Sequence, residues 1–363
     1  MRKQTVIIVL IVLALIAYGI IAERAEADTT QIVKEATVAG TVTGTDGKAL
    51  IAQLVFTGED FSARINTDML GRYEIVLPLG EYRCEITKGS EYERRTISID
   101  IADRRAKYIE PVPLKKLYDT PWIAGDLHQH SVYSFDARDS PADILVSDLS
   151  AGLTFGAITD HNDVRANDEF TNASLMGFIP MEGIEITTDR GHYNAICFDR
   201  AVDSDVSGGA ADIRRIVTEV RKDDDAYLQI NHPLRDELFD FQDWEMIEAF
   251  DGFEVWNGKG MPPYVEGEPN YMTLHKWYEL LNEGIYLPAT AGSDNHDISG
   301  NKMFATDTYA SDDERYFMTN MYSGSPRNYI YCEGPSPGDV LAAIRNGHSF
   351  LTNNPLAYLD IGG

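Results

Sequence analysis

The chain has 363 residues, which is enough for two domains with cores of their own. Its apolar fraction of 44% is that of a folded protein, and its formal net charge of −27 disfavours nucleic acid or an anionic membrane surface as a partner. Three cysteines lie far apart without the spacing of a metal site, so we interpret them as small hydrophobic core residues rather than a disulfide framework. They are Cys84, Cys197 and Cys332.

The first 27 residues have the order of an export signal. Arg2 and Lys3 precede an apolar run from Val6 to Ala22, and the A-x-A sequence Ala25-Glu26-Ala27 follows. This order predicts a secretory signal peptide that is cleaved after Ala27. The run has 17 residues, near the lower limit for spanning a bilayer, so an uncleaved membrane anchor is the alternative. Both readings place the rest of the protein outside the cytoplasm, and membrane contact is limited to this segment.

Residues 34–115 show short alternating strands separated by turn signals. A strand at 38–42, the turn Asp46-Gly47 and a strand at 52–56 predict a hairpin, and further strands follow through 68–82. No helix is predicted here, so we expect a small all-β sandwich. The order G-x-V…DG…TD-x-x-G-x-Y…LP-x-G-x-Y resembles the carboxypeptidase regulatory-like module. That resemblance implies a spacer or positioning domain without catalytic residues.

Residues 117–355 alternate between predicted strands and helices. Ser140-Pro141 and Ser336-Pro337 each predict a helix start, and apolar stripes at 213–220 and 274–281 predict two more helices. Strands are expected between them at 155–159, 178–187, 193–198, 227–231, 253–256 and 286–291. This alternation predicts an α/β fold of the TIM-like barrel type, in which functional residues gather at the carboxyl ends of the strands.

Histidines and carboxylates follow these strands repeatedly. The pattern begins with Gly125-Asp126-Leu127-His128-Gln129-His130 and recurs as Thr159-Asp160-His161-Asn162, Asn231-His232-Pro233 and Ser293-Asp294-Asn295-His296. Imidazole and carboxylate are ligands that suit zinc, manganese and iron. Because several such groups recur after strands of one predicted barrel, we expect a site that holds two to three divalent metal ions.

The ordered motifs D-L-H-x-H-S…D, T-D-H-N, E-I-T-T…G-H-x-N-A, N-H-P and G-S-D-N-H resemble the PHP (polymerase and histidinol phosphatase) metallohydrolases. The segments 254–258 and 347–352 resemble the CehA/McbA-like branch of that family. The resemblance covers about residues 115–355. It implies a distorted (β/α)7 PHP barrel with up to three divalent ions and a metal-bound hydroxide as the nucleophile.

Motif by motif, the resemblance implies nine metal ligands. His128 and His130 would bind one ion and share it with Glu185 and Asp294; Glu185 would bridge to a second ion, held by His192 and His232; and Asp136, His161 and His296 would hold a third. The loop after His130 is one residue longer than the usual form, which makes Asp139 the competitor of Asp136. We expect Asp126 and Asp160 to orient imidazoles rather than bind metal. His275 and His348 are interpreted as structural.

Three metal ions would bring six positive charges, three ligand carboxylates would return three, and a bridging hydroxide would leave roughly two. A pocket with this charge favours a small anionic substrate, and close metal pairs suit phosphoester hydrolysis. Arg138, Arg235 and Lys259 are candidates for binding phosphate oxygens, and Asn257 is a further candidate catalytic residue with Asp160. A carbamate, ester or amide hydrolase and a non-catalytic metal-binding protein are the alternatives. We expect residues 356–363 to pack on the barrel or to begin a further segment.

Overall fold

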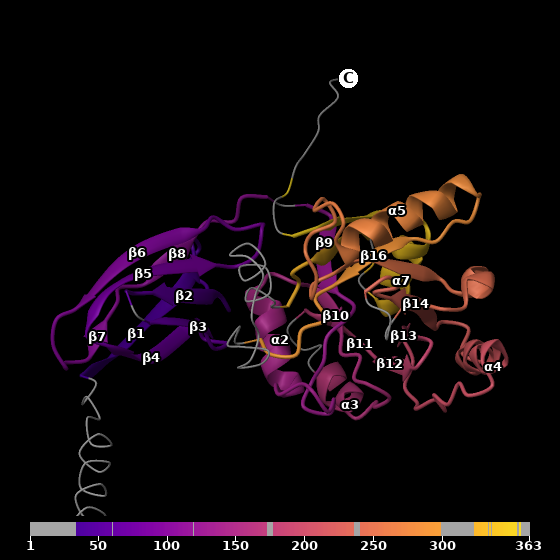
Figure 1. Ribbon diagram of the computed structural model, residues 1–363. Helices are drawn as coiled ribbons and strands as arrows, with labels where there is room; N and C mark the ends of the chain where they lie inside the picture. The colour runs from indigo at the N-terminus through magenta and orange to yellow at the C-terminus, as the bar shows by residue number, and fades with distance from the viewer. Residues whose placement is uncertain are drawn as a thin grey trace, which may run out of the picture.

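The computed structural model describes residues 34–59, 61–118, 120–172, 177–235, 240–298, 323–332, 334, 336–353 and 356. The predicted export signal and nearly all of the predicted C-terminal segment lie outside these residues. No helix among the described residues is long and apolar enough to cross a membrane. A β-rich part, in indigo and violet, lies beside a larger part that contains the helices (Figure 1).

Two four-stranded sheets form the β-rich part. One sheet has the order β4-β1-β7 with β8 paired to β1, and the other has the order β3-β2-β5-β6. The strands are β1 (Glu35–Gly44), β2 (Gln53–Thr57), β3 (Ser62–Asn66), β4 (Arg72–Pro78), β5 (Gly80–Thr87), β6 (Arg95–Ile101), β7 (Lys107–Tyr108) and β8 (Val112–Leu114). Apolar side chains from both sheets, including Val38, Leu54 and Ile86, share one buried core.

The predicted hairpin around Asp46-Gly47 is wrong. Strand β1 pairs with β4 in antiparallel register, whereas β2 pairs with β3 and β5 in the other sheet. Only an isolated bridge between Thr43 and Ala49 remains at the turn. The turn residues are those of a hairpin, but burial of the alternate apolar residues of β1 and β2 separates the two strands into facing sheets.

The larger part contains two five-stranded sheets, β11-β10-β9-β17-β18 and β12-β13-β14-β15-β16. Neighbours β9, β10 and β11 are parallel, as are β14, β15 and β16, whereas β12, β13 and β14 are mutually antiparallel and β17 is antiparallel to both β9 and β18. The strands are β9 (Trp122–Asp126), β10 (Phe155–Ala157), β11 (Ile179–Met181), β12 (Gly183–Thr188), β13 (Gly191–Ile196), β14 (Tyr227–Asn231), β15 (Gly252–Asn257), β16 (Ala289–Gly292), β17 (Arg327–Tyr331) and β18 (Ser349–Thr352).

Two helices of this part begin where local signals predict. Ser140 and Ser336 cap α2 and α7 by accepting hydrogen bonds from Asp143 N and Asp339 N, and proline occupies the first turn of both helices. The helical elements are α2 (Pro141–Ser150), α3 (Ala166–Thr171), α4 (Ala210–Val220), the 3₁₀ helix η2 (Trp244–Ala249), α5 (Pro269–Asn282) and α7 (Pro337–Arg345). The helices predicted from the stripes at 213–220 and 274–281 are α4 and α5.

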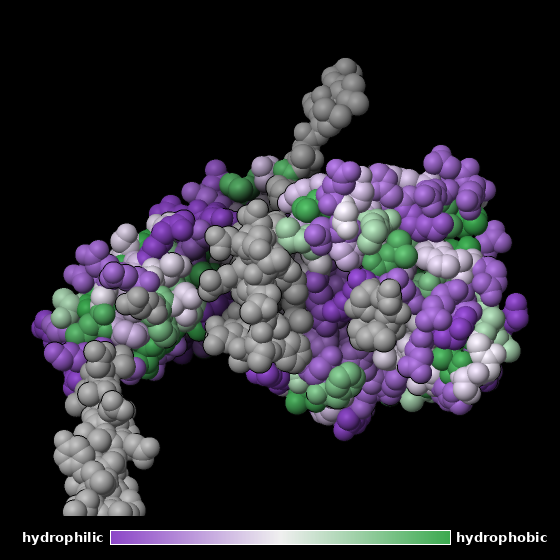
Figure 2. All heavy atoms as spheres, in the orientation of Figure 1, coloured by the Kyte–Doolittle hydropathy of each residue, from purple (hydrophilic) through white to green (hydrophobic). Residues whose placement is uncertain are grey.

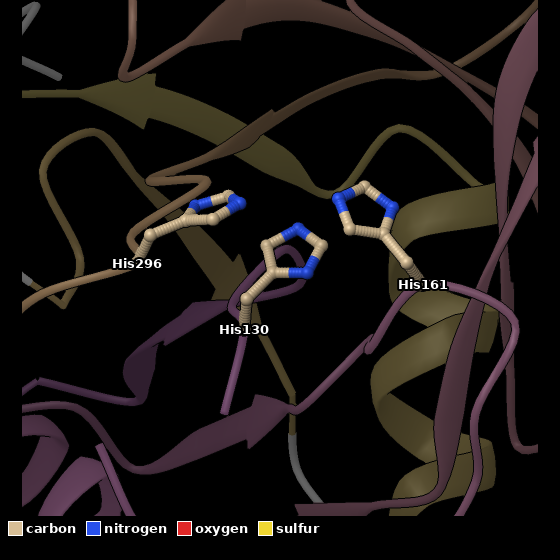
Figure 3. Close-up of side chains that lie close together, drawn as sticks. All are labelled: His130, His161 and His296. Carbon is tan, nitrogen blue, oxygen red and sulfur yellow. The ribbon is translucent and has the colours of Figure 1, made fainter. Parts of the chain in front are cut away.

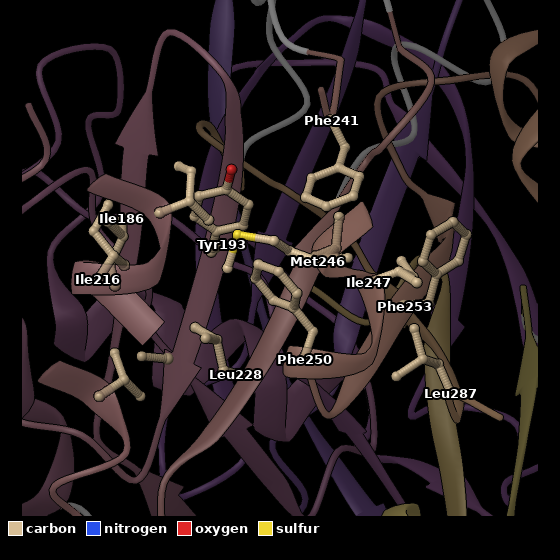
Figure 4. Packing of buried hydrophobic residues seen from close by; sticks show 14 of the residues in the cluster. Ile186, Tyr193, Ile216, Leu228, Phe241, Met246, Ile247, Phe250, Phe253 and Leu287 are labelled. Atoms are coloured by element: carbon tan, nitrogen blue, oxygen red, sulfur yellow. The ribbon is translucent and has the colours of Figure 1, made fainter. Parts of the chain in front are cut away.

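A large apolar cluster packs α4 and η2 against the second sheet (Figure 4). Tyr193 of β13 lies at its centre, with ring contacts to Phe241 and Phe250 at centroid distances of 6.2 and 5.1 Å. Phe241 and Phe253 are also fully buried. Aromatic burial on this scale makes the second sheet a rigid support for side chains at its edge.

The two sheets meet at the edge that carries the histidine motifs. Isolated parallel bridges pair Gln129 with Asn295 and His161 with Glu185, and so connect the loops of one sheet to the other. The predicted α/β class is confirmed. Among the described residues, the strands form two separate sheets that isolated bridges connect, so the closed seven-stranded barrel stays a prediction.

The β-rich part contacts α2 directly. Lys88 Nζ, which is largely buried, donates hydrogen bonds to Ile51 O at 3.0 Å and to Leu149 O at 2.8 Å. Ser150 Oγ donates to Asn66 Oδ1 at 2.8 Å. Hydrophilic residues cover most of the visible face, with scattered hydrophobic patches, which agrees with the strongly acidic composition (Figure 2).

Candidate metal centre

All nine side chains that the motifs marked as ligands lie in one cluster. Each forms at least one imidazole–carboxylate contact of 3.4 Å or less. They extend from β12, from the start of β13, or from the loops after β9, β10, β14 and β16. Because β13 runs antiparallel to β12 and β14, its first residues lie at the same edge as the carboxyl end of β14. The members are His128, His130, Asp136, His161, Glu185, His192, His232, Asp294 and His296.

Glu185 lies at the centre of the cluster and is fully buried. Its two carboxylate oxygens lie 2.7–3.6 Å from nitrogens of five imidazoles. The five histidines are His128, His130, His161, His192 and His232. A carboxylate with this many imidazole neighbours is suited to bridge two metal ions.

Three of the imidazoles converge from separate loops (Figure 3). The ring of His130 lies 4.2 Å from that of His296 and 4.5 Å from that of His161. Asp136 Oδ2 lies 3.6 Å from His161 Nε2 and 3.2 Å from His296 Nε2. Asp136 therefore faces these rings, whereas its competitor Asp139 accepts the backbone N–H of Ile298 at 2.8 Å.

The electrostatics are those of a site built for cations. Burial raises the pKa of Glu185, but the charges of His161, His192 and His128 outweigh it and hold the pKa well below its usual value. Burial also opposes the charged form of Asp294, yet Lys259 and nearby imidazoles keep its pKa well below the ordinary range. Burial, followed by repulsion from His296, holds the pKa of His130 well below its usual value. These directions keep both carboxylates charged and His130 neutral, which are the forms that bind metal. Burial opposes the charged form of His161, but Glu185 and Asp136 outweigh it and raise the pKa of His161 to about 10, so a metal ion at His161 would have to displace a proton.

Several buried atoms of the cluster have no hydrogen-bond partner in the part of the chain that the structure describes. They are His128 Nε2, His130 Nε2, Glu185 Oε2, Asp136 Oδ1 and His232 Nδ1. Unpaired buried polar atoms are costly, and a bound cation removes that cost. Four overlapping groups bring three ligand atoms within 4.8 Å of one another: His130/His161/His296, His128/His130/Glu185, His128/His232/Asp294 and His161/Glu185/His192. The donor set therefore fits divalent metal ions.

Backbone strain is concentrated at the ligands. His232 and Asp294 have positive φ angles of 26° and 51°, a region that residues other than glycine rarely adopt. Gly292 lies two residues before Asp294. A Cβ atom at position 292 would lie 2.3 Å from His128 Cβ and 2.6 Å from Glu254 Oε1. The β16 backbone thus passes close beneath His128 only because residue 292 has no side chain. Strain of this kind is typical of functional sites.

Glu254 is a functional residue that the sequence reasoning missed. It lies on β15, is fully buried, and its Oε1 is 2.9 Å from His128 Nδ1. Its Oε2 accepts the backbone N–H of His232 at 2.8 Å and Asn257 Nδ2 at 3.1 Å. A carboxylate at Nδ1 leaves the opposite nitrogen, Nε2, free to bind a metal. Its place in the motif 254–258 was the available signal, but only the fold brings β15 beside His128.

Asp126 and Asp160 act on backbone and hydroxyl groups instead of on imidazoles. Asp126 accepts the N–H groups of His128, Ser293 and Gly324 at 2.7–3.2 Å. Burial, the largest cause, raises its pKa to about 6. Asp160 accepts Ser134 Oγ at 2.8 Å, and that hydroxyl lies 3.0 Å from His130 Nδ1. Asp160 therefore acts on His130 through Ser134.

A buried amide pair joins two of the ligand loops. Gln129 stands between His128 and His130, and its Oε1 accepts Asn295 Nδ2 at 3.0 Å. His130 N donates to Asn295 O at 3.0 Å. Gln129 Nε2 also donates to Asp148 of α2 at 3.2 Å, and all these side chains are fully buried. Gln129, the middle residue of the His-x-His motif, thus connects the two ligand loops and α2.

A cavity of about 200 Å³ opens beside the cluster. His232, Arg235, Asn257 and Lys259 are among the residues that line it, together with Met261, Glu268 and Thr273. Lys259 Nζ is 3.3 Å from Asp294 Oδ1 and 3.0 Å from His296 Nε2. The pKa of Lys259 lies below its ordinary value, chiefly because the ammonium group is buried.

Two more of the predicted catalytic residues face this cavity. Arg235 Nη1 is 3.4 Å from Asp294 Oδ2, and Asn257 Nδ2 donates to the same oxygen at 3.2 Å. Arg138 differs, because it is exposed and has no hydrogen bond or ion pair with the nine clustered residues. The structure thus brings Arg235, Lys259 and Asn257 to the cluster but leaves Arg138 at the surface.

The remaining histidines and the cysteines lie away from this site. The ring of His275 lies 4.2 Å from that of Tyr271 within α5 in a tilted contact, and His348 is exposed before β18. Cys84 is buried, Cys197 and Cys332 are half-buried, and all three are free thiols.

No family model and no curated protein sequence matches the chain. Among solved structures, it is similar to a two-domain protein from Bacteroides vulgatus that contains a predicted PHP-like metal-dependent phosphoesterase, with 19% identity and a TM-score of 0.47. That match covers 64% of this chain and 65% of the Bacteroides protein. PsfC from Pseudomonas syringae matches with 14% identity and a TM-score of 0.40, over 64% of this chain and 91% of PsfC. A metal-dependent phosphoesterase candidate from Bifidobacterium adolescentis matches with 19% identity and a TM-score of 0.35, over 54% of this chain and 95% of the Bifidobacterium protein.

Proposed function

We propose that the chain is a metal-dependent hydrolase and that its substrates are phosphoesters. The observation that carries this proposal is the central carboxylate of Glu185 with five imidazole neighbours, next to a cavity that contains Lys259 and Arg235. The resemblance of the ordered motifs to PHP metallohydrolases points to the same class.

The nine clustered residues would hold two to three divalent ions, and zinc, manganese and iron all suit this donor set. Bound ions of this kind act as Lewis acids and lower the pKa of a bound water to about 7. Glu254 would keep the metal-facing nitrogen of His128 unprotonated, and Asp160 would position His130 through Ser134. Asn257 would hold Asp294 in place from the cavity side.

Lys259 and Arg235 would bind the anionic oxygens of the substrate. Lys259 has only 8% of its side-chain surface exposed, so its ammonium acts in a low-dielectric setting where its field is strong. In hydrolysis, the oxygen of water forms a bond to phosphorus, the bond from phosphorus to the leaving oxygen breaks, and that oxygen takes a proton. The buried ammonium of Lys259 and the half-buried guanidinium of Arg235, both beside the candidate ligands, favour the phosphate, on which negative charge is present throughout.

The experiment is a parallel assay of metal-loaded protein on an aryl phosphate monoester, an aryl phosphodiester and an aryl carbamate. We expect the highest kcat/KM on a phosphate substrate and a rate that falls as salt rises. Arg235→Ala should reduce phosphate turnover more than carbamate turnover.

Faster carbamate turnover that is insensitive to salt and to Arg235 would overturn the phosphoesterase proposal. It would support the alternative, a hydrolase of carbamate, ester or amide bonds. Tight metal binding without turnover of any of the three substrates would support the non-catalytic alternative.

We also propose that the protein works outside the cytoplasm, secreted or held by its N-terminal segment. The support is the order of Arg2 and Lys3, the apolar run and the A-x-A sequence that ends at Ala27. Fractionation of cells that express the full chain, with N-terminal sequencing of the product, tests export and cleavage together. A cytoplasmic product with an intact N-terminus would contradict this proposal.

A further inference from the structure

One large apolar side chain at the metal cluster is exposed to solvent. Phe135 has 86% of its surface accessible, the largest value among the exposed large hydrophobic residues that the structure describes. Val132, three residues earlier, is 52% exposed. An exposed phenylalanine is unremarkable by itself, but this one lies directly before the candidate ligand Asp136.

The ring of Phe135 is held against the cluster. It lies 5.2 Å from the ring of His161 at an interplanar angle of 26°, a stacked arrangement. The ring of His130 lies on the cluster side of His161, with centroids 4.5 Å apart and a tilt of 30°. The ring of Phe135 is therefore in contact with a candidate metal ligand and is itself exposed to solvent.

The loop that carries Phe135 is firmly anchored on both sides. Ser134 Oγ donates to Asp160 at 2.8 Å, and the base of the loop is closed by a hydrogen bond from Val132 N to Asp139 O at 2.8 Å. On the other side, Asp136 contacts His296 at 3.2 Å. The side chain is thus presented on a fixed backbone, which lowers the entropy cost of binding a ligand on it.

A series of short contacts connects the loop of Phe135 to the cation Lys259. Contacts of 3.0 and 3.2 Å lead from Lys259 Nζ to His296 Nε2 and on to Asp136. Phe135 thus lies next to a residue, Asp136, that these contacts connect to the buried ammonium of Lys259.

We propose that Phe135 is a specificity-determining residue whose ring binds an aromatic or flat apolar leaving group of the substrate. This inference rests on the proposed hydrolase function and names the class of ester: one with a ring on the leaving oxygen. Aromatic pairs contribute beyond simple burial, and removal of one partner lowers binding by about tenfold. The other face of the ring supplies the surface for such a contact.

The test uses metal-loaded full-length protein and two pairs of ligands. Phenylphosphonate and methylphosphonate measure binding by calorimetry, and phenyl phosphate and methyl phosphate measure kcat and KM. We expect Phe135→Ala to weaken phenylphosphonate binding and raise KM for phenyl phosphate about tenfold, with the methyl ligands changed less than twofold. Phe135→Tyr should restore both values, and Phe135→Leu should restore them only in part.

Tyr108→Ala removes an aromatic residue that is 63% exposed on the β-rich part, and it serves as the matched control. Metal content by elemental analysis should be the same in all these proteins. Equal losses on phenyl and methyl ligands would show that Phe135 only supports His161, and unchanged phenyl binding would also overturn the proposal. If the wild type binds both phosphonates but cleaves neither phosphate, the hydrolase proposal fails, while the binding ratio still decides the role of Phe135.

Discussion

The substitution Glu254→Gln tests how the fold orients His128. The two side chains have nearly the same shape, so the cavity left behind is negligible, and the change removes a charge and one acceptor. In the wild type, Oε1 faces His128 Nδ1 at 2.9 Å and Oε2 accepts two donors, His232 N and Asn257 Nδ2. A carboxylate satisfies all three groups, because both of its oxygens accept.

A glutamine amide has one oxygen and one NH₂ group, so it cannot do so. If its oxygen takes the place of Oε2, its NH₂ faces His128 Nδ1, and His128 must carry its proton on Nε2, the nitrogen that faces Glu185 at 3.3 Å. If the amide is turned around, its NH₂ opposes the two N–H donors. One orientation protonates the metal-facing nitrogen, and the other leaves two buried donors unpaired.

Both outcomes weaken the site by a similar amount. Loss of a group that orients a metal ligand lowers metal affinity by about 10- to 100-fold, which is about 1.4 to 2.7 kcal/mol. The assay is a competition titration of zinc and of manganese against a chromophoric chelator, with hydrolysis measured at saturating metal. Glu279→Gln is the matched control, because the Glu279 side chain is 63% exposed and pairs with Lys276 of the same helix instead of with His128. Unchanged metal affinity in Glu254→Gln would refute this reasoning.

Three further outcomes are expected. His128→Ala or Asp294→Ala should lower the metal content measured by elemental analysis and abolish hydrolysis, whereas His275→Ala should change neither. Gln129→Ala should weaken metal binding about tenfold without unfolding the protein, which circular dichroism and a chelator titration check together. Burial lowers the pKa of Lys88 from 10.5 to about 8. Between pH 8 and pH 10.5 the unfolded chain therefore binds more protons at Lys88 than the folded chain does. The contribution of Lys88 to the free energy of unfolding should rise as pH rises through this range. Denaturant titrations at pH 8 and 10 should show this rise in the wild type relative to Lys88→Met, and an equal pH response in both proteins would contradict it.

The sequence alone determined several local elements and the candidate ligands. Ser140 and Ser336 predict helix starts because capping depends on residues within one turn, and both helices begin there. Most of the histidines and carboxylates were found because they follow an apolar strand within a few residues, whereas Glu185 and His192 lie within strands. The structure places all nine in one cluster, since the strands of the two sheets present their motif-bearing ends at a common edge.

Tertiary structure decided which residues support these ligands. Glu254 reaches His128 across 126 positions of sequence, and Lys259 reaches His296 across 37, so no local pattern marks either contact. Arg138 was as plausible as Arg235 by nearness to a motif, yet it points to solvent while Arg235 faces Asp294. The turn residues Asp46-Gly47 likewise gave no indication that β1 pairs with β4. Capping and alternation depend on neighbours along the chain, whereas strand pairing and the surroundings of a side chain depend on which buried surfaces fit together.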